Sequence, residues 1–302
     1  MRKLARCAAV LSMCVLGCGA HAATVIPAGN NPMISVGGSY VLAQAVASIT
    51  VSANNVDLDL GGYRVGNFGT CVLINGGVSA GCSGGTAGSA PGIKVTGANV
   101  TIHNGRVEGA LGDGIDVYAS QPGAFVNVQI NDVTVDNNSG YGIAIFGTGA
   151  SLSNVKAYQN LLDGILLQDQ VRLEHVTASY NNGAGVNGAA GAGNYYDVMT
   201  ARNKTSGIVA NGSLAKVNAK YNGGQGMVVS GVLRDSSAEF NGAEGVNATQ
   251  RGLVVDSASS QNTGNGFTLG SATCYRNLSA NQNTGSAVSG GTPLTGTLAS
   301  CN

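Results

Sequence analysis

Apolar and polar residues alternate along most of this chain in short runs, and one such block recurs about every 20 residues. Seven times between residues 138 and 266 the chain places an Asn, three residues, a Gly and then a large apolar residue. The Asn/Gly pairs are Asn138/Gly142, Asn160/Gly164, Asn181/Gly185, Asn203/Gly207, Asn222/Gly226, Asn241/Gly245 and Asn262/Gly266. Their spacing of 19 to 22 residues predicts a solenoid in which each repeat forms one coil.

Further apolar columns appear when each repeat is counted back from its Asn. The eighth residue before it is Ile130, Leu152, Leu173, Tyr195, Leu214, Leu233 or Val254. The fifth is Val133, Val155, Val176, Val198, Val217, Ser236 or Ser257, and the third is Val135, Ala157, Ala178, Thr200, Ala219, Ala238 or Ser259. Because polar residues separate these columns, the pattern predicts that each coil adds one strand to each of three parallel sheets.

The repeat period of about 20 residues and the spacing of two residues between apolar positions exclude other kinds of solenoid. Helical repeats need about 33 residues or more, and the six-residue rhythm of left-handed hexapeptide helices is absent from this sequence. We therefore predict an all-β fold, a single-stranded right-handed parallel β-helix of about ten coils.

The repeated Asn and Gly are predicted to build one corner of each coil. Asn tolerates the left-handed backbone region, and its amide can bond the amide of the next coil about 4.8 Å away, which gives an Asn ladder. The Gly permits a positive φ or close packing where the next strand begins.

The repeat also sets the expected boundaries. We predict a signal peptide at residues 1–22, an N-terminal cap at 23–48, the β-helix at 49–285 and a C-terminal tail at 286–302. In the early coils the frame is less regular, and Ala110 stands where the corner Asn is expected.

Residues 1–22 have the features of an export signal. Basic residues precede the apolar run 8–16, and the segment Ala20-His21-Ala22 matches a small-residue cleavage site. The run is too short to span a bilayer. Cleavage here predicts a secreted or periplasmic protein, and the alternative is lipoprotein processing that leaves Cys18 acylated.

Composition changes this picture little. The chain holds 48 Gly, 5 Pro and no Trp, and 43% of its residues are hydrophobic, so it builds a core from small and β-branched side chains. Beyond residue 22 there are 12 basic and 15 acidic residues, a net charge of −3, which gives no indication of nucleic-acid binding.

Four cysteines lie beyond the signal segment. An even number in an exported chain favours two disulfides, and three pairings are possible. Proximity in sequence favours Cys71 with Cys82, around a Gly/Ser-rich excursion, and Cys274 with Cys301, at the C-terminal end.

An Asp-Leu-Asp-Leu-Gly-Gly segment at residues 57–62, followed by tandem Asn-x-x-x-Gly-Ile coils, resembles the pectin-lyase-like superfamily, in particular exported bacterial proteins built from parallel β-helix repeats. The resemblance covers roughly residues 30–285. It implies that the chain acts on or binds a polysaccharide laid along one outer sheet. The superfamily includes lyases, hydrolases, epimerases and members without a known reaction, so it does not select an activity.

The catalytic motifs of the familiar enzymes of this superfamily are mostly missing. Only Asp113-Gly114-Ile115-Asp116 is similar to the Asn-Thr-Asp strand of polygalacturonases, and their other three motifs have no counterpart. The Asp-Pro-His-Asp of alginate epimerases is also absent, as is the Trp-containing segment of pectate lyases.

Charged outward positions gather between the second and fifth coils. Arg106 and Lys156 fall two rungs apart, roughly 10 Å, and either is a candidate base for a lyase reaction beside a uronate carboxylate. Asp132 and Asp136 are candidate ligands for Ca²⁺, and Tyr158 is a candidate for substrate binding. The alternative is a solvated sheet face whose charges prevent aggregation.

A second candidate site lies on the strand that follows the Gly. Asp113 and Asp116 flank Gly114-Ile115, and Asp163 is expected two coils away from Asp113. Two carboxylates separated by roughly 6.5 to 9.5 Å would suit an inverting glycosidase. The alternative is that these Asp residues only shape turns.

Rings and one guanidinium occupy the position just before the corner Asn. Tyr180, Arg202, Tyr221 and Phe240 take this place in successive coils, where they either stack on sugar faces or pack against the corner. His103 and His175 are expected to be surface residues. Two functions remain open from the sequence, a polysaccharide lyase or hydrolase and a non-catalytic structural or adhesion solenoid, as a monomer or a homotrimer.

Overall fold

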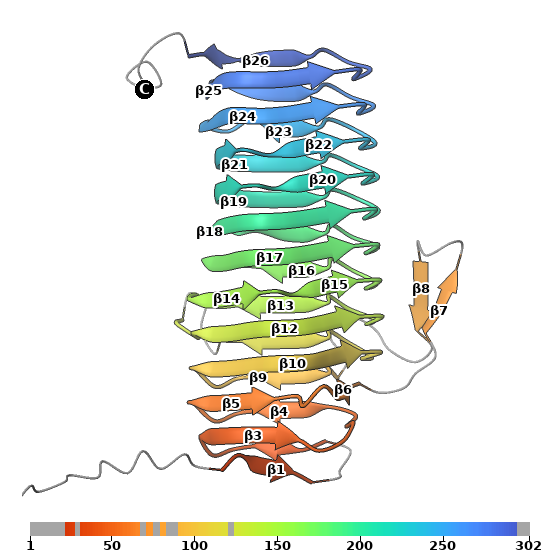
Figure 1. Cartoon of the computed structure of the whole chain (residues 1–302), viewed down its shortest axis with the longest axis vertical. Coiled ribbons are helices and arrows are strands. Elements are labelled where there is room, and N and C mark those ends of the chain that lie inside the picture. Colours follow the sequence, from red (N-terminus) through yellow and green to blue (C-terminus); the bar gives the residue numbers. More distant parts are fainter. Residues whose placement is uncertain are drawn as a thin grey trace, which may run out of the picture.

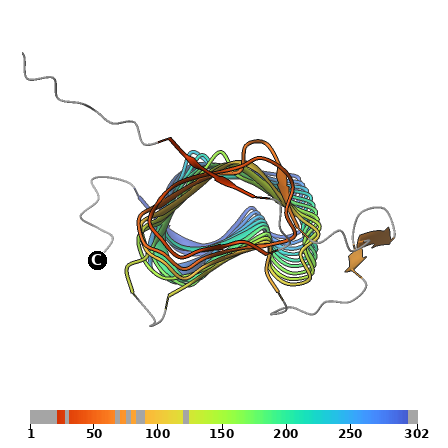
Figure 2. The same ribbon diagram turned by 90° about the horizontal axis from the view of Figure 1, so that it is seen from below.

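Each sequence repeat forms one coil, and the coils stack along one axis into a column of about 11 turns (Figure 1). The computed structural model describes residues 22–27, 31–66, 71–74, 79–82, 90–119 and 124–294. All regular elements in these ranges are strands, and the column is a right-handed parallel β-helix, as predicted. Seen along the axis, successive coils superimpose around one shared interior (Figure 2).

Three stacks of parallel strands run the length of the column. The strands that serve the first stack are β1 (Thr24–Ile26), β3 (Gly38–Leu42), β5 (Val56–Asp59), β10 (Val100–Glu108), β12 (Val128–Asp136), β14 (Ala150–Ser153), β17 (Val171–Ser179), β18 (Val186–Ala201), β19 (Ile208–Ala215), β21 (Met227–Arg234), β24 (Gly252–Ser260), β25 (Phe267–Asn281) and β26 (Val288–Pro293). The longer of these strands turn a corner and continue into a neighbouring stack.

The second stack adds β6 (Arg64–Val65), β15 (Lys156–Tyr158), β20 (Asn218–Lys220) and β22 (Ser237–Glu239) to the C-terminal halves of β10, β12, β17 and β24. The third adds β2 (Met33–Ile34), β4 (Ile49–Val51), β9 (Ile93–Val95), β11 (Ile115–Tyr118), β13 (Ile143–Phe146), β16 (Ile165–Leu167) and β23 (Val246–Ala248) to the N-terminal ends of β18, β19, β21, β25 and β26. β7 (Cys71–Ile74) and β8 (Ser79–Cys82) form a separate antiparallel hairpin.

The rungs begin before the expected start of the helix. β1 pairs with β3, and β2 pairs with β4, so strands within the segment predicted as a cap already belong to the column. At the other end the last described strand, β26, reaches Pro293. No helix in the described ranges is long and apolar enough to cross a membrane.

The predicted apolar columns form the core. Every residue of the four columns is buried, with no more than 5% of its surface exposed, and even Ser236 and Ser257 face inward. The polar positions between them point outward. The two-residue alternation of apolar and polar positions therefore predicted correctly which side chains face inward in all three stacks.

The Asn column forms the predicted ladder and extends one coil further, to Asn283. Each Asn donates from Nδ2 to Oδ1 of the Asn in the next coil at 2.9–3.0 Å. The backbone N–H of each donates to the same oxygen. At the N-terminal end, Ala110 donates its N–H to Asn138 at 2.9 Å. The ladder thus pairs buried polar groups that would otherwise oppose folding.

The left-handed residue at this corner is not the ladder Asn, and that part of the prediction was wrong. The residue before it has the positive φ, from 54° to 58°: Asn137, Gln159, Tyr180, Arg202, Tyr221, Phe240, Gln261 and Gln282. The chain must already have turned for the next side chain, the Asn, to point into the ladder. The Gly residues of the repeat lack a positive φ and serve close packing instead, since an added Cβ would lie 2.5–2.7 Å from a ladder Nδ2.

One of the two predicted disulfides is supported in part. Cys274 is disulfide-bonded, and its expected partner, Cys301, lies outside the described residues. Cys71 and Cys82 are paired residues of the β7–β8 hairpin, so their backbones face each other, and their bond stays a prediction. The proposed acylation site Cys18 and most of the predicted signal peptide also lie outside the described ranges.

Candidate functional site

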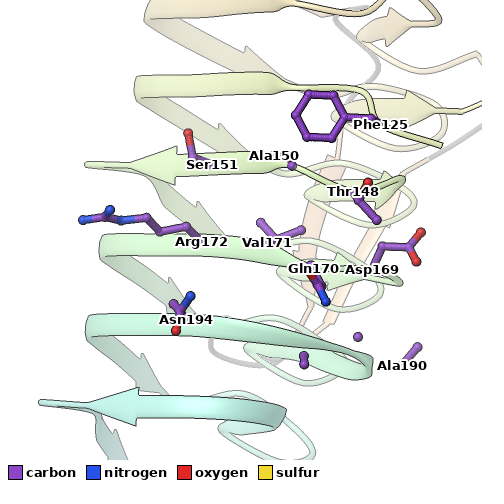
Figure 3. Close-up of a pocket in the computed structure, with 13 residues that line it drawn as sticks. Phe125, Thr148, Ala150, Ser151, Asp169, Gln170, Val171, Arg172, Ala190 and Asn194 are labelled. Atoms are coloured by element: carbon purple, nitrogen blue, oxygen red, sulfur yellow. The ribbon is translucent and has the colours of Figure 1, made fainter. Parts of the chain in front are cut away.

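A cleft of about 720 Å³ opens at the corner where the chain passes from the third stack to the first (Figure 3). Its walls come from four successive coils. The residues that line it are Phe125, Thr148, Gly149, Ala150, Ser151, Asp169, Gln170, Val171, Arg172, Ala190, Gly191, Ala192 and Asn194. Its volume falls in the range of pockets that bind small molecules or parts of longer chains.

The cleft lies where this corner carries extra residues. Three residues connect the two stacks at 147–149, 168–170 and 189–191, and a longer connection runs from Tyr118 to Val128. In β19 and β21 the connection disappears, because each strand passes directly from one stack to the other. The sequence contained this signal, since the coils with Asn spacings of 21 or 22 residues have the connection and those with 19 lack it.

Phe125 stands at one end of the cleft and is 67% exposed. Its ring lies against the backbone of Gly149, where an added Cβ would come within 2.4 Å of the ring, and its backbone forms a parallel bridge with Thr148. An exposed aromatic ring held by backbone contacts can bind an apolar face of a ligand at a low entropic cost.

Polar side chains from adjacent rungs line the side of the cleft on the first stack. Ser151, Arg172 and Asn194 are register partners on β14, β17 and β18, so their outward side chains follow one another along the axis (Figure 3). Arg172 Nη2 lies 2.7 Å from Glu174 Oε2 on the same strand. The cleft therefore presents hydroxyl and amide groups together with a guanidinium that is already paired.

The same outer face continues to the corner between the first and second stacks. There His175 Nδ1 lies 2.7 Å from Asp197 Oδ2, and its Nε2 lies 3.8 Å from Glu174 Oε1. One rung further, Lys216 Nζ donates to the Tyr196 hydroxyl at 2.7 Å, and this hydrogen bond is the main cause of a raised pKa of Lys216. An imidazole between two carboxylates, next to a phenol, has the components for proton transfer.

Sequence reasoning missed this group. His175 was expected to be a surface residue, and about half of its side chain is exposed, but its contact with Asp197 was not predicted. Tyr196 and Lys216 were not considered. The residues share no recognisable motif, because they belong to three coils and meet only through the register of β17, β18 and β19. The available signal was the spacing, which makes Glu174 and Tyr196 outward neighbours on adjacent rungs.

The predicted charged face of the second stack is a network of ion pairs. Arg106 donates from Nε and Nη2 to the two oxygens of Asp136 at 2.7 and 2.6 Å, and its Nε also lies 2.6 Å from Glu108 Oε2. Glu108 is held in turn by Arg64 at 2.7 Å. The hydrogen bonds to Asp136 raise the pKa of Arg106, so this side chain keeps its proton and the structure does not support its expected role as a base.

Of the other residues predicted on this face, Tyr158 and Asp136 belong to the network, and Lys156 does not. Lys156 is exposed and lies two rungs from Arg106, as the register predicted. Tyr158 is on the network, with its hydroxyl 3.4 Å from Arg106 Nη2. Asp136 is fully buried and accepts from Arg106 and Asn137.

The two proposed Ca²⁺ ligands have separate partners. Asp132 occupies the other corner, where it accepts a hydrogen bond from Asn154. Across the described ranges no three His, Cys, Asp or Glu side chains gather where they could hold a metal ion. Asp132 and Asp136 therefore do not form the oxygen cage that Ca²⁺ requires.

The second predicted site contains partly buried carboxylates. Asp113 accepts the backbone N–H of Tyr141 at 2.8 Å, and Asp163 accepts that of Ala184 and the amide of Asn187, so both Asp residues hold the turn of the next coil. Burial raises the pKa of Asp113. Burial and the neighbouring charge of Asp113 raise the pKa of Asp116 to about 6, against a smaller opposing effect of Lys94.

The raised pKa of Asp116 predicts a stability that depends on pH. The folded-state pKa lies above the unfolded-state value, so the folded protein binds the proton more tightly and its stability falls as the pH rises from about 4 to about 6. Asp116→Asn should therefore raise the free energy of unfolding at pH 7 by about 2 kcal/mol and change it little at pH 4.

Urea denaturation of both proteins at the two pH values checks this prediction. Asp235→Asn, which replaces an exposed carboxylate, is the control and should change the stability by less than about 0.5 kcal/mol. An Asp116→Asn protein that is less stable than the wild type at pH 7 would contradict the expectation.

The ring strip is continuous. The guanidinium carbon of Arg202 lies 5.4 Å from the ring centres of both Tyr180 and Tyr221, and the rings of Tyr221 and Phe240 stack at 4.8 Å with an angle of 9°. Arg202 also donates to the Tyr180 hydroxyl at 2.7 Å. These side chains cover each other's faces, so mainly their edges remain for solvent, and the expected stacking on sugars stays a prediction.

The fold defined by these stacks is that of the pectin-lyase-like right-handed parallel β-helix proteins. Two similar solved structures are the A-modules of the mannuronan C-5 epimerases AlgE4 and AlgE6 of Azotobacter vinelandii. AlgE4 is 15% identical, with a TM-score of 0.59 over 86% of this chain and 91% of that chain. AlgE6 is 18% identical, with a TM-score of 0.59 over 86% and 92%. No protein-family model and no curated protein sequence matches this chain.

Proposed function

We propose that this chain is an exported protein that binds polysaccharide across the outer face of the first stack, with one part of the glycan in the cleft. The observation that carries the proposal is the cleft itself, which combines a fixed exposed ring at Phe125 with outward polar groups on successive rungs. Rungs about 4.8 Å apart match an extended chain of sugars, because each sugar advances by a similar length.

Two further observations support this function. The epimerases that share the fold act, by their names, on mannuronan, which is a polysaccharide. Extra corner residues from four successive coils wall the cleft between Phe125 and Asn194, and the next two coils lack them, so this part of the column has a shape that can hold a ligand. The sequence start, with its basic residues and apolar run, supports export.

The other candidate is a non-catalytic structural solenoid without a glycan site. It is favoured by the regularity of the coils beyond residue 203, where the cleft corner has no extra residues in two successive coils. The two functions differ in whether Phe125 matters. If the chain is a structural solenoid, loss of this exposed ring should not change its function.

A glycan array with the purified chain tests the proposal. We expect retention on at least one polysaccharide, and we expect Phe125→Ala to weaken that binding about tenfold, because a ring contact of about 1.4 kcal/mol is lost. Tyr63→Ala removes an exposed ring from the first coils and should leave binding unchanged. Equal retention of the wild type and Phe125→Ala, or no retention on any glycan, would contradict the proposal.

Catalysis is measured with the same proteins. Incubation with each retained polymer, with and without Ca²⁺, is followed by assays of reducing ends and of the absorbance of unsaturated products. Product formation that His175→Ala abolishes, with binding preserved, would add an enzymatic step at the His175–Asp197 pair.

A further inference from the structure

We propose that the cleft takes an uncharged sugar chain, and this inference rests on the glycan binding proposed above. The ligand class follows from the charges of the face and from their partners. Only two of the residues that line the cleft are charged, Asp169 and Arg172, and they have opposite signs. Arg172 is already paired with Glu174 at 2.7 Å. Among its described lining residues, the cleft therefore offers no unpaired cation to a ligand.

The surrounding surface has the same character. Lys216 donates to Tyr196, and the carboxylates of Asp197 and Asp235 act on it as well. His175 lies between Asp197 and Glu174. Asp235 is itself paired with Arg234 at 3.4 Å. The carboxylates of Asp169, Glu174, Asp197 and Asp235 are thus accompanied by the permanent cations Arg172, Lys216 and Arg234, and the face carries little net charge.

An acidic polysaccharide fits this face poorly. A uronate chain carries one carboxylate on each sugar, and a carboxylate in the cleft meets the like charge of Asp169, because Glu174 and Arg172 already neutralise each other. Such a chain needs free cations or bound divalent ions as partners. Within the described ranges no group of acidic or His side chains is arranged to hold an ion that could bridge the two.

A basic polysaccharide is also disfavoured, because Asp169 is the single carboxylate among the described residues that line the cleft. The nearby Glu174 is paired with Arg172, so a chain with one amine on each sugar finds few acidic partners there. An uncharged chain needs hydroxyl partners instead. Ser151, Gln170 and Asn194 provide them, and Phe125 provides the apolar contact.

Affinity electrophoresis of the full chain tests the ligand class. The polymers are galactomannan and mixed-linkage β-glucan as uncharged chains, alginate and polygalacturonate as acidic chains, and chitosan as a basic chain. We expect an uncharged polymer to retard the protein, with an affinity that changes less than about twofold between about 50 and 500 mM NaCl. Phe125→Ala should weaken this binding about tenfold, and Tyr63→Ala less than twofold.

The outcomes separate this inference from the proposed function. Retardation by alginate or polygalacturonate alone, lost in Phe125→Ala and weakened by salt, would keep glycan binding in the cleft and overturn the uncharged ligand. Retardation by chitosan alone would overturn it in the same way. No retardation by any polymer would contradict the proposed function and this inference together.

Discussion

Asn203→Ala is expected to lower the free energy of unfolding by roughly 3 to 5 kcal/mol. The Asn203 side chain accepts from the N–H and Nδ2 of Asn181 and donates to Ala178 and Asn222. Alanine removes all four hydrogen bonds. The Asn181 N–H then loses its acceptor in a place where the ladder excludes water, and Asn181 Nδ2 keeps only its bond to Ala157. Each buried unsatisfied group costs about 1–3 kcal/mol.

Urea denaturation followed by far-UV circular dichroism measures this loss. The control is Asn211→Ala on β19, which removes an amide outside the ladder and should cost less than about 0.5 kcal/mol. In a solenoid each coil contacts only its neighbours, so we also expect faster amide exchange in the coils next to Asn203 than in distant coils. A loss below about 1 kcal/mol would mean that the ladder contributes little to stability.

Gly207→Ala should destabilise the protein by about 3 kcal/mol or more, although it adds only one methyl group. A Cβ at this position would lie 2.5 Å from the carbonyl oxygen of Gly226, 2.6 Å from Thr200 Oγ1 and 2.7 Å from Asn222 Nδ2. The coils cannot separate to make space, because strand hydrogen bonds hold neighbouring rungs about 4.8 Å apart. The methyl group must therefore disrupt either the ladder or the pairing of β19 with β21.

Thermal and urea unfolding of Gly207→Ala check this prediction. Ser206→Ala, one residue earlier in the same turn, is the control, because it changes a half-buried side chain without adding an atom to a Gly position. We expect its midpoint to stay close to that of the wild type. A Gly207→Ala protein as stable as the wild type would show that the Gly column is not required for close packing.

The repeat made the fold accessible from the sequence. In a solenoid each coil meets the same environment, so the alternation of apolar and polar residues carries the same information many times, and Ile130 or Leu214 can be placed inward by counting alone. The backbone conformation at the corner was harder to predict. The residue with the left-handed conformation is set by where the chain turns, and Tyr180 and Phe240 are not residue types that indicate a positive φ.

The candidate site was largely out of reach. Outward positions carry no periodic constraint, and the sequence could show that Arg106 and Asp136 share a face but not that they form a bidentate pair. The cleft depended on corner connections that are absent in two coils, three residues long in others and longer between Tyr118 and Val128. The His175–Asp197 contact depended on the register between two strands.

The solenoid, its three strand stacks, the inward columns and the Asn ladder could all be derived from the sequence, because they follow from a local period that every coil repeats. Which outward residues act together emerged only from the folded chain. It closed the Arg106–Asp136 network, brought Phe125 over Gly149 and assembled a cleft from four coils. The physical reason is that a side chain on the surface is placed by its neighbours in adjacent rungs, about 20 residues away in sequence, and not by the pattern of its own strand.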